Sequence, residues 1–345
     1  MPKLSIIVPV FNTESYLGEC LDSLLNQTLL DIEIIVVNDC SPGNCSEIVN
    51  EKKQTDNRLR LIENKINLGT FHTRKAGVLC AEGEFITFVD SDDSLKSEAC
   101  SMIYNALMSS GADIAHIACS RFEGVNFKHI PFSDEADEHA FRPQAGLVTA
   151  DKWREQLIEY DIDNCVWSYA VRKELYFKAY SKLEFCPRLL MLEDFLLMFT
   201  VSGENVNNCI YLEERLYNYR IDASGITQSI GNTDKLIAMI SDISYSLITS
   251  EKILSKSQYY TQEMLLRFKN RMIHDFEWYA KQFFKLPDEQ KALAIERLDK
   301  KNTATIWLNL IARLGEKYSN NKYLIFDYLP TKEKLKVIIK FFLGR

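Results

Sequence analysis

The stretch Phe88-Val89-Asp90-Ser91-Asp92-Asp93 places three carboxylates directly after an apolar run. The run predicts a short buried strand, and the carboxyl ends of strands are where open α/β sheets contact their ligands. Asp90 and Asp92 are one residue apart and can direct oxygen ligands at a single Mg²⁺ or Mn²⁺ ion. A turn or a helix cap is the alternative, because Asp and Ser favour both. The rest of the chain decides between these interpretations.

Residues 1 to about 118 alternate predicted strands with predicted helices. Leu4–Val10 and Ile32–Val37 are apolar and rich in β-branched residues, as expected of buried strands in a parallel sheet. Apolar residues at helical spacing predict a helix over residues near 14–27. Further strands are expected at Arg58–Ile62, Glu84–Val89 and Asp113–Ala118. Further helices are expected at Ser46–Lys53, 70–81 and Ser97–Met108, with Ser46 and Ser97 as N-caps. This alternation predicts the α/β class, a parallel sheet covered by helices.

The later part of the chain has a different character. Residues 120–150 are polar and predict loops with short strands, and residues 151–225 predict short helices with one strand, Val206–Leu212. Apolar residues then recur at helical period, so residues 233–318 predict an α-helical appendage. The last segment, 331–345, has five basic residues, one acidic residue and an apolar helical face. It is either a helix that binds a membrane surface or a last helix packed on the appendage.

Composition narrows the class of protein. A chain of 345 residues with 46% hydrophobic residues can bury a large core, and its length favours two domains or one domain with an appendage. The net charge of −7 gives no support to nucleic-acid binding. Nine cysteines without a C-x-x-C pair favour reduced thiols in a cytoplasmic protein. The apolar run after Met1 is too short for a signal peptide, and no stretch reaches the ~20 apolar residues that span a bilayer.

Five segments occur in a recognisable order. They are Ser5-Ile-Ile-Val-Pro-Val-Phe-Asn12, Glu33-Ile-Ile-Val-Val-Asn-Asp-Cys-Ser41, Asn67-Leu-Gly69 with Arg74, Ala81-Glu-Gly-Glu84, and Asp90-Ser-Asp-Asp93. Together they resemble glycosyltransferase family 2, whose domains have the Rossmann-like GT-A fold. The resemblance covers residues 1–225 and implies a nucleotide-sugar-binding half, 1–118, and an acceptor-side half, 119–225. A helical region, 226–330, and the basic tail, 331–345, complete the expected organisation.

The resemblance implies nucleotide-binding roles for residues that follow the first two predicted strands. Pro9, Phe11 and Asp39 would hold the nucleotide of the donor. Asp39 can accept a hydrogen bond from a uracil N–H, which favours a UDP-sugar. Its alternative role is that of a turn residue before Ser41-Pro42-Gly43. No G-x-G-x-x-G or G-x-x-x-x-G-K-[ST] motif is present, so a nucleotide would be held without these phosphate loops.

The resemblance also gives roles to Arg74 and to the acidic stretch. Arg74 would contact the base or the diphosphate, although a solvated surface charge is the commoner fate of an arginine. Asp90 would contact the ribose or the metal, Asp92 would bind the Mn²⁺ or Mg²⁺ ion, and Asp93 would contact hydroxyls of the donor sugar. A cation suits this position, because UDP leaves with developing negative charge.

Three later segments resemble parts of the acceptor side in the same family. Met191-Leu-Glu193-Asp194 resembles a second acidic motif, which implies Asp194 as the general base and Glu193 as the second choice. The alternative is that these acids favour a helix amino terminus. Trp167 could stack on an acceptor sugar or lie in the core. Arg220 could contact phosphate oxygens.

We therefore expect an inverting glycosyltransferase that moves a hexose or N-acetylhexosamine from a UDP-sugar to a hydroxyl of a growing surface glycan. The stereochemistry and the acceptor, a glycan or lipid-linked glycan, follow from the resemblance. The tail, 331–345, adds an expected peripheral contact with the inner face of the membrane. The alternatives are a sugar nucleotidyltransferase and a catalytically degenerate domain kept for binding partners. Aromatic-rich helices at 257–285 could form a homodimer interface or pack within the core.

Overall fold

The computed structural model describes residues 1–123, 128–129, 144–159, 161–221 and 233–271, together with residues 287 and 289. The chain forms two compact units. Unit 1 comprises Met1–Leu189, Glu193–Ala223 and Ile253–Met264, and unit 2 comprises Leu190–Leu192, Ser224–Lys252 and Leu265–Arg345. Unit 1 contains the sheet and every residue expected in the site.

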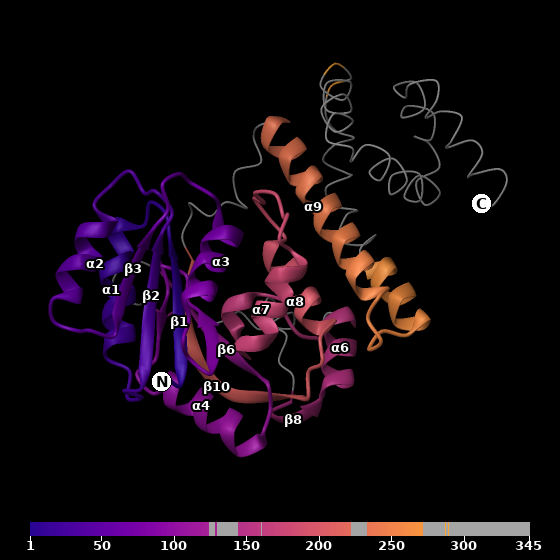
Figure 1. Cartoon of the computed structure of the whole chain (residues 1–345), viewed down its shortest axis with the longest axis horizontal. Coiled ribbons are helices and arrows are strands. Elements are labelled where there is room, and N and C mark those ends of the chain that lie inside the picture. The colour runs from indigo at the N-terminus through magenta and orange to yellow at the C-terminus, as the bar shows by residue number, and fades with distance from the viewer. Residues whose placement is uncertain are drawn as a thin grey trace. The chain divides into compact units, whose positions relative to one another are not determined.

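Four parallel strands form the first half of the sheet (Figure 1). They are β1 (Leu4–Val10), β2 (Ile32–Asn38), β3 (Leu59–Glu63) and β4 (Phe85–Phe88), in the spatial order β3-β2-β1-β4. Every residue of β2 is buried, as expected of a parallel strand covered on both faces. These strands confirm the expected parallel arrangement, with ends that differ by at most one residue from those predicted.

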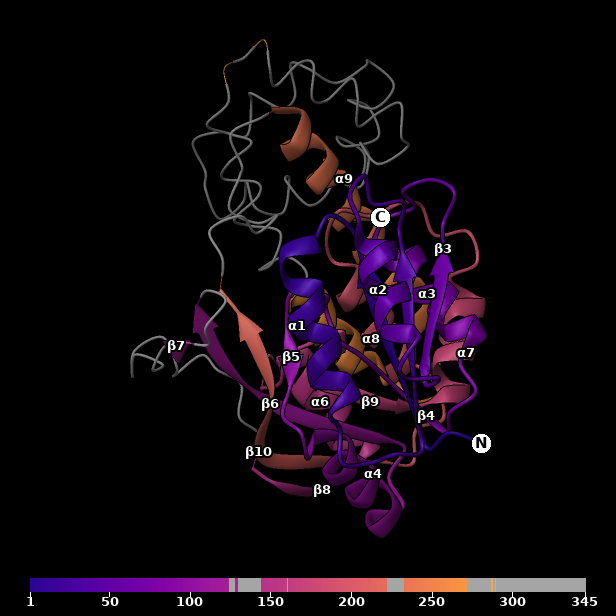
Figure 2. The same ribbon diagram turned by 90° about the vertical axis from the view of Figure 1, so that its left-hand side faces the viewer.

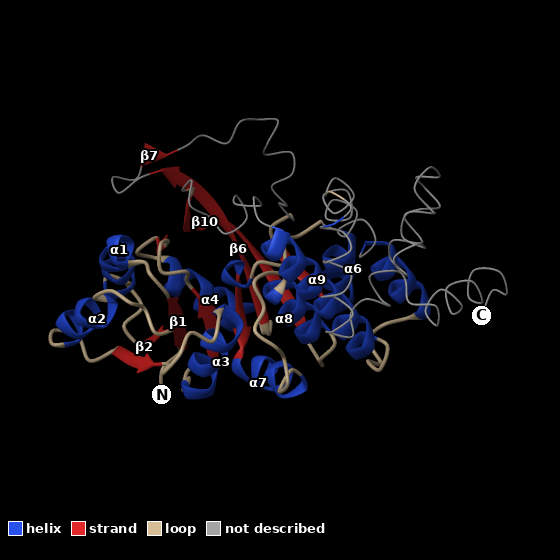
Figure 3. Cartoon of the chain, turned by 90° about the horizontal axis from the view of Figure 1, so that it is seen from above, coloured by secondary structure: helices blue, strands red, loops and turns tan. Residues whose placement is uncertain are grey.

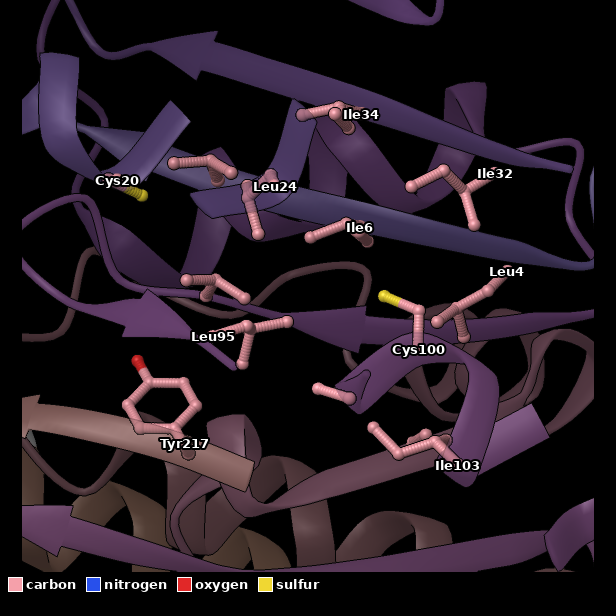
Figure 4. Packing of buried hydrophobic residues seen from close by; sticks show 14 of the residues in the cluster. Leu4, Ile6, Cys20, Leu24, Ile32, Ile34, Leu95, Cys100, Ile103 and Tyr217 are labelled. Carbon is pink, nitrogen blue, oxygen red and sulfur yellow. The ribbon is translucent and has the colours of Figure 1, made fainter. Parts of the chain in front are cut away.

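Three helices share one face of this half of the sheet. α1 (Glu14–Leu25), α2 (Cys45–Lys53) and α4 (Ala99–Ser110) contribute buried side chains to one apolar cluster with β1 and β2. Figure 4 shows Leu24 of α1 beside Ile6 of β1. The buried residues of α1 are Leu17, Cys20, Leu21 and Leu24, which recur at helical spacing and confirm the amphipathic helix expected there.

The opposite face is covered by α3 (Thr70–Cys80), which confirms the helix expected over residues 70–81. Figure 3 shows α1 and α3 on opposite sides of β1. A Cβ atom on Gly77 would lie 2.4 Å from the side chain of Ile7 and 3.3 Å from that of Val37. Glycine therefore permits the close approach of α3, the helix that carries Arg74.

α2 and α4 do not use the serines that were expected to cap them. Asn44 is the N-cap of α2, and the hydroxyl of Ser46 donates to the carboxylate of Glu63 (2.6 Å). Glu98 is the N-cap of α4, and the hydroxyl of Ser97 donates to the carboxylate of Glu98 (2.9 Å). Serine favours N-caps in general, but here a nearby carboxylate accepts each hydroxyl instead.

The second half of the sheet is mixed, in the order β4-β9-β6-β10-β5. β9 (Tyr169–Arg172) is antiparallel to both β4 and β6 (Ile114–Glu123), whereas β10 (Asn208–Arg220) runs parallel to β6. β5 (Ser94–Leu95) pairs antiparallel with β10. β6 therefore runs in the same direction as β4, so Asp113–Ala118 belongs to the parallel series as expected, but it does not pair with β4. β9 separates it from β4, and four residues are too few to show a strand pattern.

β10 is 13 residues long and extends well beyond the expected strand, Val206–Leu212. Residues 213–215 are all charged, and the pairing with β6 shifts register between Tyr211 and Arg215. Figure 2 shows β6 and β10 side by side, with β7 (Lys128–His129) on β6. β8 (Gly146–Thr149) pairs with β10. Because its middle residues are charged and its register is irregular, the apolar pattern of the sequence predicts only the first part of β10.

Three helices and one helical turn complete unit 1. They are α6 (Ala150–Glu159), the 3-10 helix η1 (Val166–Ser168), α7 (Lys173–Lys182) and α8 (Glu193–Ser202). These elements confirm the short helices expected between residues 151 and 225. η1 and the start of α8 carry the residues that the resemblance placed on the acceptor side.

α9 (Thr233–Leu254) and residues 262–271 are helical, within the region where helices were expected. The basic tail, 331–345, and residues 272–285 of the aromatic segment 257–285 lie outside the described residues, so the membrane and dimer predictions remain predictions. In the part of the chain that the structure describes, no helix is long and apolar enough to cross a bilayer.

Candidate active site

The loops after β2, β1 and β4 meet at one edge of the sheet, because these three strands are adjacent and parallel. The hydroxyl of Thr13, after β1, donates to that of Ser91, in the acidic stretch after β4 (2.8 Å). The backbone N–H of Asp39, after β2, donates to the carbonyl of Val10 at the end of β1 (2.8 Å). Three segments expected to bind the donor are thus brought together.

Asp39 is buried, and its carboxylate organises the loop that leads into α3. One oxygen accepts from the side chain of Asn64 (2.7 Å) and the N–H of Leu68 (2.9 Å), and the other accepts from the N–H of Gly69 (2.8 Å). Gly69 has a φ of 85°, a left-handed conformation that glycine adopts without strain. Asp39 therefore has a definite structural task at the position expected to meet the nucleotide.

The remaining nucleotide candidates lie at the end of β1 and just after it. Pro9 is a partly buried residue of β1, and Phe11 follows the strand with 49% of its surface exposed. An exposed aromatic ring beside the ends of parallel strands is available for a planar base.

Asp93 is the buried aspartate of the acidic stretch. Its carboxylate accepts from the hydroxyl of Tyr217 and from the N–H of Arg220, both at 2.7 Å. Burial and the charges of Asp92 and Asp90 raise the pKa of Asp93 well above its ordinary value. The structure therefore gives Asp93 a role in tying the acidic stretch to β10, in addition to the expected donor-sugar contact.

Asp90 and Asp92 are more open than Asp93. The side chain of Asp90 is 30% exposed, and one of its oxygens accepts from Arg74 (2.8 Å). Asp92 is partly buried, and its backbone carbonyl accepts from the Nε atom of Arg220 (2.7 Å). The described residues contain no group of three or more His, Cys, Asp or Glu that could hold a metal. Two carboxylates still fit Mg²⁺ or Mn²⁺, which complete their shells with water and phosphate oxygens.

Arg74 is not a solvated surface charge. Its side chain is 4% exposed, and its guanidinium contacts Asp194 as well as Asp90. The Glu193 carboxylate lies 3.9 Å away, and the guanidinium sits 5.6 Å from the ring centroid of Phe88. Arg74 therefore joins the acidic stretch after β4 to the second acidic motif.

Glu193 and Asp194 begin α8, so the expected helix-start role holds together with their place in the site. Their side chains are 19% and 22% exposed, and Asp194 also accepts from the N–H of Val166 (3.3 Å). Burial and the neighbouring Asp194 raise the pKa of Glu193 to about 7. Burial also raises the pKa of Asp194, against the opposing charge of Arg74. A buried carboxylate with a raised pKa is better suited to accept a proton than an exposed one.

Trp167 lies in η1 and stacks on the rings of two β10 residues. The ring centroids are 4.5 Å from Tyr217 and 5.6 Å from Tyr219, with interplanar angles of 25° and 23°. Trp167 is partly buried against the apolar core, and Tyr219 is 37% exposed. The core role of Trp167 is therefore present, and the stack borders the acidic stretch, because Tyr217 bonds Asp93.

Arg220 lies under the acidic stretch. Its side chain is 1% exposed, donates to Glu19 (2.9 Å) and lies between the rings of Tyr16 and Phe122 at 4.6 and 4.4 Å. Its backbone N–H donates to the carboxylate of Asp93 and its Nε donates to the backbone carbonyl of Asp92, so Arg220 holds the acidic stretch in place. A contact with donor phosphates would require movement of this buried side chain.

The pattern of residues did not point to Asp163 or His116. The Asp163 carboxylate accepts from the hydroxyl of Ser168 and from the N–H of Cys165 (3.0 Å), and it contacts Nε2 of His116 (3.1 Å). This arrangement holds η1, the element that carries Trp167 and the N–H bonded to Asp194. His116 is 47 positions from Asp163 in the chain, so no local spacing connects the two.

Residues 5–168 match the family model described as Glycosyl transferase family 2. The uncharacterized glycosyltransferase EpsJ of Bacillus subtilis is 33% identical over 230 residues, which are 66% of this chain and 64% of EpsJ. The poly(ribitol-phosphate) beta-glucosyltransferase of Bacillus spizizenii is 39% identical over 134 residues, 38% of this chain and 21% of that protein. The matched region thus spans less than two thirds of each relative.

The fold is that of residues 1–349 of TarS from S. aureus. The two structures align with a TM-score of 0.66 at 22% identity, over 99% of this chain and 92% of the TarS chain. The same TarS fragment has been solved with UDP and with UDP-GlcNAc. The chain therefore belongs to glycosyltransferase family 2, a family of sugar-transferring enzymes, and has the GT-A fold.

Proposed function

We propose that the chain is an inverting glycosyltransferase that moves a hexose or N-acetylhexosamine from a UDP-sugar to a hydroxyl of a growing surface glycan. The observation that carries this proposal is the meeting of two acidic groups across Arg74: Asp90, in the stretch with Asp92, and Asp194, beside Glu193. The first group suits a donor diphosphate with its cation, and the second suits an acceptor hydroxyl.

A UDP-sugar donor is favoured by the position of Asp39. Each carboxylate oxygen can accept two hydrogen bonds, and Oδ2 of Asp39 accepts one from Gly69, which leaves room for a uracil N–H. The TarS fragment, which shares this fold, has been solved with UDP and UDP-GlcNAc. Pro9 and Phe11 would flank the base at the end of β1.

Asp92 and Asp90 would hold the Mn²⁺ or Mg²⁺ ion. The cation would supply positive charge that stabilises the departing diphosphate. Asp93 and Arg220 hold the backbone of this stretch, so the two open carboxylates are kept at fixed positions. Asp93 would reach a donor hydroxyl only at the cost of one of its present hydrogen bonds.

Asp194 would take the proton of the acceptor hydroxyl as the hydroxyl oxygen attacks the anomeric carbon. The bond between that carbon and the UDP oxygen breaks, UDP leaves with the electron pair, and the configuration inverts because attack and departure occur on opposite faces. A positioned base contributes ~10²–10⁴ in rate. Trp167, beside the second acidic motif, would offer its edge or face to the acceptor sugar.

A surface glycan or a lipid-linked glycan is the proposed acceptor. The support comes from one relative, whose name gives poly(ribitol-phosphate) as its acceptor polymer. The proposed contact of the tail, 331–345, with the membrane would place the enzyme near such an acceptor.

The test is UDP release from a panel of UDP-sugars, with Mn²⁺ or with EDTA, for the wild-type chain and Asp92→Ala. Asp161→Ala, an exposed residue outside the site, is the matched control. We expect release from one donor, lost with EDTA and in Asp92→Ala but kept in Asp161→Ala. No release from any donor, together with no metal-dependent binding of UDP, would contradict the proposal and favour a degenerate domain.

A further inference from the structure

Arg74 is buried, whereas the carboxylates that it contacts are partly exposed to solvent. Its side chain is 4% exposed, against 30% for Asp90 and 22% for Asp194. NH1 donates to Asp194, and NH2 donates to Asp90 at 2.8 Å. A group that met the donor directly would be expected to share the exposure of the carboxylates.

We infer that Arg74 is a positioning residue for Asp194, and that it couples the base to the donor-side carboxylate Asp90. This inference rests on the proposed function. The guanidinium is a rigid planar fork, so two donors on one plane fix the spacing of the two carboxylates. The second oxygen of Asp194 accepts from the N–H of Val166 at 3.3 Å, so both oxygens of the base are held.

The surroundings of Arg74 keep it in place. The guanidinium faces the ring of Phe88, and that ring meets Tyr176 edge-on with centroids 5.3 Å apart. The Nε atom of Arg74 is buried without a hydrogen-bond partner among the described residues. Moving a charged group out of its ion pairs into such an apolar setting is costly, so the bonds to Asp90 and Asp194 hold the side chain.

Charge gives this geometry a chemical consequence. Titratable groups around Asp194 come from several elements: Arg74 on α3, Asp90 after β4, Glu193 on α8, Tyr176 on α7 and Cys165 before η1. In this set Arg74 is the cation, and Asp90, Glu193 and Asp194 are three carboxylates. Removing Arg74 would raise the pKa of Asp194 further, so the base would be ionised only at higher pH.

The first experiment compares Arg74→Gln and Arg74→Lys with the wild-type chain. It uses binding of UDP with Mn²⁺, and the pH profile of kcat for the UDP-sugar that the wild-type chain turns over fastest in the panel. We expect kcat of Arg74→Gln to fall roughly 10²-fold, as for loss of a positioned base. The acidic limb should move to higher pH, and Arg74→Lys should recover part of the rate. Binding of UDP should change by less than about threefold, below 1 kcal/mol.

A direct nucleotide role for Arg74 gives the opposite result. Binding of UDP would then weaken more than about tenfold, with kcat unchanged at saturating donor, and this outcome overturns the inference. Arg172→Gln is the matched control, because Arg172 also bridges two carboxylates, those of Glu84 (3.0 Å) and Asp113 (2.6 Å), outside the site. It should leave both kcat and the acidic limb unchanged.

A double variant shows whether Arg74 acts through Asp194. If it does, Arg74→Gln should cost little more than about threefold when Asp194→Asn is already present. If the losses of kcat in the two single variants instead multiply in the double variant, the inference is contradicted, whereas the proposed function is not affected. Full turnover by Asp194→Asn alone would instead remove the base assignment, whatever the Arg74 variants do.

Discussion

The two halves of unit 1 build their parts of the site differently. In residues 1–118, each strand leads directly into its loop and helix, and the loops of adjacent strands meet at one edge. In residues 144–221, neighbours in the sheet are far apart in the chain, and Asp194 enters the site from the start of α8. A local pattern can specify the first half, whereas the second half depends on contacts between distant segments.

The largest expected effect is a loss of kcat without a loss of UDP binding, which would show that the two halves have different tasks. Asp194→Asn should lower kcat by ~10²–10⁴ while binding of UDP with Mn²⁺ stays within about threefold, because every nucleotide candidate except the buried Arg220 lies in the other half. UDP release and titration calorimetry measure the two quantities. An equal loss of UDP binding would show that the halves do not act separately, and a greater loss of kcat in Glu193→Gln would move the base to that residue.

The second effect tests the long-range contacts that hold η1. Asp163→Ala should lower the free energy of unfolding by about 2–3 kcal/mol, because His116, Ser168 and the N–H of Cys165 lose a shared partner. Urea unfolding followed by circular dichroism measures this change. Asp161→Ala is the control, with an expected change within about 0.5 kcal/mol. A native-like stability of Asp163→Ala would refute the importance given to this cluster.

The third effect tests local packing in residues 1–118. Gly77→Ala should destabilise the protein by about 1–3 kcal/mol, since the new methyl would meet Ile7 at 2.4 Å. Gly18→Ala, also in a helix, should stabilise it by about 0.5–1 kcal/mol, because no atom lies within 4 Å of the added carbon. The pair is compared by thermal and urea unfolding. Equal effects would show that α3 can move away from β1 without cost.

The smallest effect concerns pH. Glu193 has a folded pKa of about 7, above its ordinary 4.5, so the folded state binds its proton more tightly than the unfolded state. Stability of the wild-type chain should therefore fall as pH rises from 4.5 to 7. Glu193→Gln should gain about 1–2 kcal/mol more stability relative to wild type at pH 8 than at pH 5. Urea unfolding at both values measures this, and the exposed Glu174→Gln should show no such difference.

The fold was predictable where one stretch of sequence forms one layer. The apolar runs of β1 and β2 and the apolar spacing of α1 predicted these elements with nearly correct ends, and α3 was also expected. β9 was missed because four residues show no period, and β10 was shortened because its middle is charged. These failures lie where pairing with distant strands, not local preference, decides the structure.

The residue types of the candidate site could be read from the sequence, but the contacts between those residues could not. The sequence predicted that Asp39, Asp90 and Asp92 follow the carboxyl ends of strands. It also predicted that Glu193 and Asp194 lie at the start of a helix. Nothing local indicated that Arg74 would be buried between Asp90 and Asp194, which are 104 positions apart by the numbering. The roles of Asp163 and His116 were invisible for the same reason.

One consequence of the bonds from β10 to Asp93 concerns protein synthesis. The two hydrogen bonds on its carboxylate span 124 and 127 residues of chain. At ~5–20 residues per second, the ribosome would add their donors roughly 6–25 s after Asp93. During that interval the nascent chain can pair β1, β2, β3 and β4 but lacks the two groups that bond the carboxylate of Asp93. A translation product that stops before Tyr217 would therefore have the four parallel strands but not the two hydrogen bonds that hold Asp93.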